Sequence, residues 1–194
     1  MDEPGRAKET LHRYLRRSRD DLRSKVEGLS EYDARRPLTP TGTNVLGLVK
    51  HVASVQLWYF GEVFGRPSGR SLPWFADDAE PDADFWLPPG ETPAQILELH
   101  DFSAAHADAT IEALPLAAPG EVPWWPPERR QVTLHQILVH MCVETARHAG
   151  HADVLRELID SAAGQRPGDG NLTQRTADQW AAHRAQIEAA ARGA

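Results

Sequence analysis

Two residues in one long predicted helix, Glu144 and His148, carry side chains that could do chemistry and lie four positions apart. Each residue of a helix turns by about 100°, so both fall on the apolar stripe that also carries Ile137, Met141 and Leu155. A carboxylate and an imidazole are thus directed toward the core, where burying a charge is costly unless the charge is paired or bound to a metal. The spacing therefore predicts a buried polar pair or a metal site.

His51 is the third candidate, because it lies at or beside the apolar face of an earlier predicted helix. Two ligands at i and i+4 on one helix, with a histidine from a neighbour, leave coordination positions open, as catalytic metal sites do. The chain has one cysteine, Cys142, so nitrogen and oxygen must hold any metal. His51, Glu144 and His148 could form such a set. A structural alternative without a metal, in which His51 bonds to Glu144, stays open.

Other residues of the same helix are weaker candidates. His140 precedes Glu144 by four positions, so this pair is geometrically possible, but His140 lies nearer the edge of the buried stripe. We expect His140 and His151 to lie outside direct coordination. Cys142 lies on the side away from Glu144 and His148, which favours a small buried hydrophobic residue over a nucleophile.

The elements that must position these residues are predicted helices. Apolar residues recur at helical spacing in four core stretches and one C-terminal stretch, about 8–27, 45–64, 92–114, 133–160 and 173–192. A short extended piece or hairpin is predicted in 121–130. No convincing series of strands occurs, so we expect an all-α fold, a four-helix bundle with an additional C-terminal helix. A length of 194 residues fits one domain, 1–194.

The segment 65–90 is longer than most connections in a bundle and contains five prolines and four aromatic residues, Trp74, Phe75, Phe85 and Trp86. These aromatic residues could either fasten the segment to the bundle or line the mouth of a pocket. Its acidic run, Asp77, Asp78 and Glu80, is typical of a solvated loop.

Charge and hydropathy exclude some partners. The net charge is −7, and the arginines are spread among acids, which argues against nucleic acid or an anionic membrane as the main partner. There is no run of 18 apolar residues and no pattern of a signal peptide. We therefore expect a cytoplasmic protein with no membrane partner that acts on small molecules.

Two stretches resemble a known family: LGLVKHVASVQLWYFGEVFGR from Leu46 and LVHMCVETARHAGHADVLRELID from Leu138. They are similar to the corresponding helices of the DinB/YfiT-like superfamily of metal-binding four-helix bundles, in the same order and separation. The resemblance implies a divalent metal, zinc or nickel, bound by His51, Glu144 and His148. The Glu144/His148 pair resembles the variant in the mycothiol-dependent maleylpyruvate isomerases of that superfamily.

The resemblance also implies a function. Enzymes of the superfamily use a low-molecular-weight thiol such as mycothiol or bacillithiol, so we expect a metal-dependent thiol S-transferase or isomerase that acts on a small electrophile. The expected partners are the thiol and the electrophile, with a homodimer as a possible assembly. The alternative is a non-catalytic metal-binding or dimeric stress-associated bundle. A concave pocket over the metal would favour the enzyme.

Overall fold

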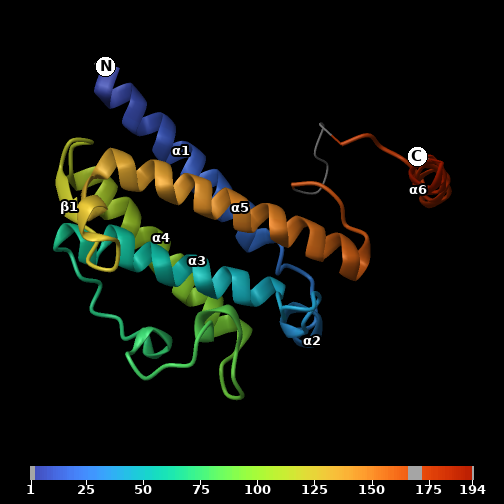
Figure 1. Ribbon diagram of the computed structural model, residues 1–194, viewed down its shortest axis with the longest axis horizontal. Coiled ribbons are helices and arrows are strands. Elements are labelled where there is room, and N and C mark those ends of the chain that lie inside the picture. Colours follow the sequence, from blue (N-terminus) through green and yellow to red (C-terminus); the bar gives the residue numbers. More distant parts are fainter. Residues whose placement is uncertain (1–2, 166–171, 194) are drawn as a thin grey trace.

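Four long helices dominate the computed structural model, which describes residues 3–165 and 172–193. They are α1 (Glu3–Ser24), α3 (Val45–Phe60), α4 (Pro93–Ala113) and α5 (Leu134–Asp160) (Figure 1). The predicted all-α fold is confirmed, and three of the four core helices begin within one residue of the predicted start. The first helix begins earlier than predicted, at Glu3.

Capping side chains explain where α3, α4 and α5 begin. Asn44 precedes α3, and its Oδ1 accepts from the backbone N–H of Gly47 at 2.7 Å. Thr92 forms a capping box with Gln95 ahead of α4, whose first residue is a proline. The side chain of Thr133 accepts a hydrogen bond from the backbone N–H of Gln136 at the start of α5. Each cap satisfies a backbone donor that the helix leaves unpaired, which typically contributes about 1 kcal/mol.

Polar contacts show the relative directions in which the helices run. The thiol of Cys142 donates to the carbonyl of Leu11 early in α1, and Arg156 donates to the carbonyl of Lys25 just past its end. Helix α5 therefore runs parallel to α1. Helix α4 is antiparallel to α1, because His12 contacts Asp108 whereas Arg23, further along α1, contacts Asp101 earlier in α4.

A partly buried ion pair joins α1 to α4. Arg19 is 2% exposed and donates from Nη1 to the carboxylate of Asp108 at 2.8 Å and to the carbonyl of Ala104 at 3.1 Å. His12 Nε2 lies 2.7 Å from the same carboxylate. Burial raises the pKa of Asp108, but the hydrogen bond from His12 and the charge of Arg19 outweigh it and lower the pKa to about 2.

The apolar core has two main parts along the bundle. One contains Phe60, Ile111 and Met141, and the other contains Leu22, Leu46 and Leu155. Burial of a side chain of this size typically contributes about 1.5–3 kcal/mol. Along α5, Glu144 lies between Met141 of the first part and Leu155 of the second. The candidate site therefore lies where the two parts of the core meet.

Two segments differ from the prediction. The helix predicted for 45–64 ends at Phe60, and a 3-10 helix, η1 (Glu62–Phe64), follows Gly61. A short helix, α2 (Glu31–Arg35), with Ser30 as its cap, lies between the first two predicted helices, where the sequence predicts no helix. The pattern of apolar residues could not reveal α2, because five residues are too few to show a helical period.

The predicted hairpin is present around 121–130. Strands β1 (Pro119–Glu121) and β2 (Gln131–Thr133) pair antiparallel, with Gly120 opposite Val132. Among the described residues these two strands are the only sheet. Their connection carries Trp124 and Trp125 to the end of α3.

Helix α6 (Ala177–Arg192) is the predicted C-terminal helix, and it begins four residues later than expected because Thr176 is its cap. It lies beyond the end of the bundle (Figure 1), and none of its residues is buried. Ile187, one of the apolar residues of this helix, is 57% exposed. No helix in the part of the chain that the structure describes is long and apolar enough to cross a membrane.

Candidate metal centre

His51, Glu144 and His148 meet between α3 and α5. The Nε2 atom of His51 lies 3.2 Å from Oε1 of Glu144, and Nε2 of His148 lies 3.0 Å from the same oxygen. One ligand atom from each residue lies within 4.8 Å of the other two. The structure thus brings together the three residues that the sequence singled out and leaves His140 outside this group.

The three residues differ in exposure. His148 is buried, and the side chain of His51 is 12% exposed, but that of Glu144 is 28% exposed. Glu144 therefore reaches partly to solvent, rather than lying fully in the core as its place on the stripe suggested. Hydrogen bonds from His148 and His51 hold the pKa of Glu144 well below its usual range. The site contains an ionised carboxylate that is open to solvent on one side.

Asp84 also belongs to the site, although the sequence analysis did not select it. It lies in the 3-10 helix η3 (Ala83–Phe85), is 7% exposed, and places Oδ2 2.6 Å from Nδ1 of His51. A carboxylate behind a histidine commonly fixes the tautomer and orientation of a metal ligand. The only sequence signal was its position next to Phe85 and Trp86 in an acidic loop.

Lys50 holds the loop that carries Asp84. Its side chain is 1% exposed, and Nζ donates to the carbonyls of Ala83 at 3.1 Å and Trp86 at 2.9 Å. The same ammonium pairs with Glu91 at 2.8 Å. These two carbonyls lie on either side of Asp84 in the chain. Lys50 therefore holds the backbone that positions Asp84, and Asp84 in turn orients the His51 ring.

The start of α3 provides a second contact with this loop. Asn44 Nδ2 donates to the carbonyl of Phe85 at 3.1 Å. A Cβ atom at Gly47 would lie 1.8 Å from that same carbonyl oxygen, so the close approach requires glycine. The ring of Phe85 then stacks on His51, with ring centroids 4.0 Å apart. The loop therefore covers one face of the imidazole as well as its Nδ1 atom.

The hydrogen bonds of His51 suggest a positive group between α3 and α5. Its Nδ1 and Nε2 atoms both face carboxylate oxygens, of Asp84 and Glu144, yet a neutral imidazole has one proton. Burial lowers the pKa of His51, but the hydrogen bonds to Asp84 and Glu144 raise it above its ordinary value. A second proton or a metal ion is needed between Nε2 and Glu144.

The donor set fits a divalent metal. Two imidazole nitrogens and one carboxylate oxygen are ligands of catalytic zinc sites, which keep a position open for water or substrate. The buried His51–Asp84 pair supplies the outer hydrogen bond that such a ligand usually has. His148 differs, because its Nδ1 is buried and has no hydrogen-bond partner among the described residues.

The remaining residues of α5 occupy other surroundings. The ring of His140 packs 4.7 Å from Tyr59 and 5.3 Å from Trp125, and burial lowers its pKa. His151 is exposed. The Sγ atom of Cys142 donates to a carbonyl of α1, and burial raises the pKa of the thiol. A thiol with a raised pKa that faces another helix is a poor nucleophile.

A group of aromatic side chains lies about two helical turns from His51 along α3. The ring of Trp58 lies between Phe75 at 4.3 Å and Trp124 at 5.0 Å, and Trp125 Nε1 donates to the hydroxyl of Tyr59 at 3.0 Å. Trp74 instead fastens its loop to the bundle, because its Nε1 donates to Ser54 Oγ. Trp74, Phe75 and Phe85 thus fasten the segment 65–90 to the bundle, which is one of the two roles that the sequence left open, and the lining of a pocket mouth stays a prediction.

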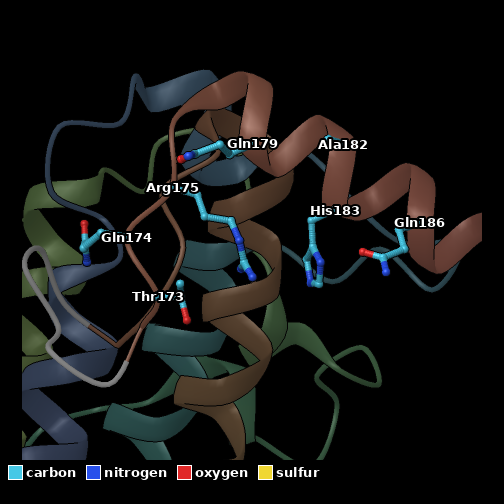
Figure 2. Close-up of a pocket in the computed structure, with 7 residues that line it drawn as sticks. All are labelled: Thr173, Gln174, Arg175, Gln179, Ala182, His183 and Gln186. Atoms are coloured by element: carbon cyan, nitrogen blue, oxygen red, sulfur yellow. The ribbon is translucent and has the colours of Figure 1, made fainter.

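An open pocket lies elsewhere, on α6 and the segment before it. Figure 2 shows its lining residues, which include Thr173, Arg175 and His183, and none of the three candidate ligands is among them. This pocket is formed by polar side chains at the surface of an exposed helix. It is therefore separate from the candidate metal centre.

Comparison with known proteins identifies the family. The sequence model described as Mycothiol-S-transferase matches residues 10–161, which include α3, α4, α5 and the loop with Asp84. No curated protein matches the chain. The matched range contains every residue of the candidate centre and excludes α6.

Proposed function

We propose that this chain, which belongs to the mycothiol S-transferase family, is a metal-dependent transferase that joins a low-molecular-weight thiol to a small electrophile. Mycothiol is the thiol that the family description supports. In this proposal His51, Glu144 and His148 are the metal ligands. Zinc is the first candidate because its catalytic sites use this donor set, and nickel, which also binds imidazole, is the second.

The observation that carries the proposal is the convergence of both Nε2 atoms on one carboxylate oxygen, at 3.0 and 3.2 Å, with Asp84 behind His51. A purely structural hydrogen bond between His51 and Glu144 would need neither the second histidine nor the second carboxylate. Three side chains from two helices that already point at one position reduce the reorganisation needed to bind a cation.

Each protein group has a separate task in the reaction. A bound divalent ion would supply the Lewis acidity that lowers the pKa of an incoming thiol, so that its S–H proton passes to solvent water and the thiolate sulfur can bond to the electrophile, which releases its leaving group or, in an addition, takes up a proton from water. Glu144 contributes one negative charge to the site. Its partly exposed side chain lies on the side of the proposed metal position that faces solvent. Asp84 holds Nδ1 of His51, which leaves Nε2 free for the ligand position. Phe85 keeps water from one face of the His51 ring.

The test is a thiol-consumption assay with mycothiol, other small thiols and a panel of electrophiles, preceded by elemental analysis of the purified protein. We expect a bound divalent metal and consumption of mycothiol with at least one electrophile. His148→Ala should remove most of the metal and the activity, because it deletes a direct ligand.

Two control variants separate a ligand from a neighbour on the same helix. His140→Ala should keep most of the metal, since His140 packs against Tyr59 and Trp125. Cys142→Ala should keep the activity, because the reacting sulfur comes from the cosubstrate. Equal loss of metal in the two histidine variants would contradict the ligand assignment. Bound metal without turnover of any panel member would favour a non-catalytic metal-binding bundle.

A further inference from the structure

The candidate metal centre continues into a partly exposed strip between α3 and α5. Two rows of side chains, spaced four residues apart on the facing sides of these helices, form the strip: His51, Val55 and Tyr59 on α3, and His148, Glu144 and His140 on α5. The rows meet at both ends, because His51 contacts Glu144 and the ring of Tyr59 lies 4.7 Å from that of His140. Val55 and His140 are partly exposed, as Glu144 is, so solvent reaches the strip beyond the metal centre.

Indole rings gather at the end of the strip that lies far from His51. Trp58 has a partly exposed ring on α3, and Trp124 and Trp125 come from the connection between β1 and β2, beside the end of α3 (Figure 1). Trp124 is 42% exposed, and its ring lies 5.0 Å from that of Trp58 and 5.4 Å from that of Tyr59. The ring of Trp125 lies 5.3 Å from that of His140. Exposed aromatic rings next to a candidate active site are typical of a ligand-binding surface.

Hydrogen-bonding groups lie at the edges of these rings. The hydroxyl of Tyr59 accepts from Trp125 Nε1 at 3.0 Å, which leaves its own proton available to a ligand. The ring nitrogens of His140 have no hydrogen-bond partner among the described residues. Burial lowers the pKa of His140, so at neutral pH its imidazole offers one donor and one acceptor.

Aromatic faces with hydrogen-bonding groups at their edges fit a particular kind of ligand ring. The face of an aromatic ring is slightly negative, so it attracts the slightly positive C–H bonds on the face of a saturated ring. Hydroxyl groups around the rim of that ring then reach the polar groups beside the aromatic rings. Sugars and cyclitols have this form, whereas a purely apolar electrophile would leave the polar groups unused.

Distance favours the thiol cosubstrate as the occupant. Tyr59 lies eight residues beyond His51, which is roughly 12 Å along the axis of α3. In the proposed function the thiol sulfur binds at the metal, so the rest of the thiol must extend away from that point, whereas the electrophile needs only to reach the sulfur. Mycothiol has the required shape, because its sulfur lies on an N-acetylcysteine and its hydroxylated rings, glucosamine and inositol, lie at the other end.

We propose that the strip between α3 and α5 binds the body of a sugar-bearing thiol, with its rings stacked on Trp58 and Trp124. The hydroxyl groups of these rings bond to His140 and Tyr59. This inference rests on the proposed function, because it takes the metal as the position of the sulfur. These aromatic residues then determine which thiol the protein uses, and they do so without contacting the metal.

The first experiment compares mycothiol with N-acetylcysteine, which has the same thiol end and no rings. Trp124→Ala should raise the KM for mycothiol by about 3- to 10-fold, the loss typical of one aromatic contact. The kcat/KM for N-acetylcysteine, the KM for the electrophile and the metal content should all stay at wild-type values. Trp86→Ala is the matched control, because Trp86 is also 42% exposed but follows Phe85 at the His51 end of the strip. It should leave the kinetics of both thiols unchanged.

A binding measurement separates this inference from the proposed function. Glucosaminyl-inositol, the ring portion without the thiol, should bind with equal affinity to the wild type and to the metal-depleted His148→Ala protein in an NMR titration, since the rings lie away from the metal. Trp124→Ala and His140→Ala should weaken this binding, and Trp86→Ala should not. Binding of the fragment without turnover of any thiol would contradict the transferase proposal and support the ring-binding strip.

Three results would overturn the inference while leaving the transferase proposal intact. The first is a Trp124→Ala protein with wild-type KM for mycothiol and wild-type binding of the fragment. The second is an equal loss in the Trp124→Ala and Trp86→Ala proteins. The third is a rise in the KM for the electrophile in place of that for mycothiol, which would assign the aromatic rings to the electrophile.

Discussion

At the scale of residues, the chemistry of the centre depends on how each histidine is held. His51 has Asp84 at 2.6 Å behind its ring, and His148 has no partner at Nδ1 among the described residues. A histidine with a carboxylate behind it is fixed in one tautomer, with Nε2 directed at the ligand position. In the proposed ligand set His51 is thus the oriented member, and its orientation depends on a residue 33 positions away in the sequence.

Asp84→Asn tests this dependence. An asparagine cannot supply the negative charge behind His51, so we expect metal affinity to fall by about 10- to 100-fold while the protein remains folded. Competition with a chromophoric chelator measures the affinity. Asp77→Asn, in an exposed part of the same loop, is the control and should leave affinity unchanged. An Asp84→Asn protein with wild-type affinity would show that Asp84 only fastens the loop.

At the scale of elements, the loop around η3 is held by α3 and α2. Lys50 donates to the carbonyls at both ends of the turn, and Arg35 of α2 donates to the carbonyl of Leu87 at 3.0 Å. Arg35 thus ties α2 to the end of the loop that carries Asp84. Both anchors are long-range hydrogen bonds from side chains to the backbone, which a helical pattern does not encode.

Lys50→Met removes the main anchor while keeping an unbranched side chain of similar length. We expect the carbonyls of Ala83 and Trp86 to lose their partner, the melting temperature to fall, and metal affinity to fall with it, because Asp84 is no longer fixed. Lys8→Met is a matched control, since Lys8 also donates to two carbonyls, of Glu112 and Leu114, far from the centre. Loss of affinity in both variants would contradict a local role for Lys50.

The α1–α4 ion pair predicts how stability depends on pH. The pKa of Asp108 is lowered from 3.8 to about 2 in the folded protein. Its contribution to the free energy of unfolding, about 2 kcal/mol, is therefore fully present above pH ~4 and is lost as pH falls from ~4 to ~2. Asp108→Asn should lower stability at neutral pH and flatten the dependence in that window, as measured by chemical denaturation. If the free energy of unfolding of the Asp108→Asn protein falls with pH in this window as steeply as that of the wild type, Asp108 does not account for the loss.

At the scale of the whole molecule, much of the bundle could be predicted because helical periodicity is a local signal. The starts of α3, α4 and α5 were predicted to within one residue, since Asn44, Thr92 and Thr133 are readable caps. The three central residues could be chosen from their helical phase and from the family resemblance. Asp84 could not, because its burial depends on contacts that Lys50 and Asn44 make across the fold. The assignment of the chain to one domain and its cytoplasmic location stay predictions.

Metal binding should stabilise the entire fold, because the ligands come from two helices and assemble only in the folded chain. We expect a strong chelator to lower the melting temperature of the wild-type protein. A His51→Ala/His148→Ala double variant should show no further decrease on addition of chelator. The same shift in both proteins would mean that the chelator acts at a different site.

The most direct measurement of the central proposal is anomalous diffraction at the zinc absorption edge from crystals of the zinc-loaded protein. We predict one strong peak between α3 and α5, at about 2.0–2.2 Å from Nε2 of His51, Nε2 of His148 and an oxygen of Glu144. A peak bound by His140 in place of His148, or no peak between these helices in a protein that contains zinc, would contradict it.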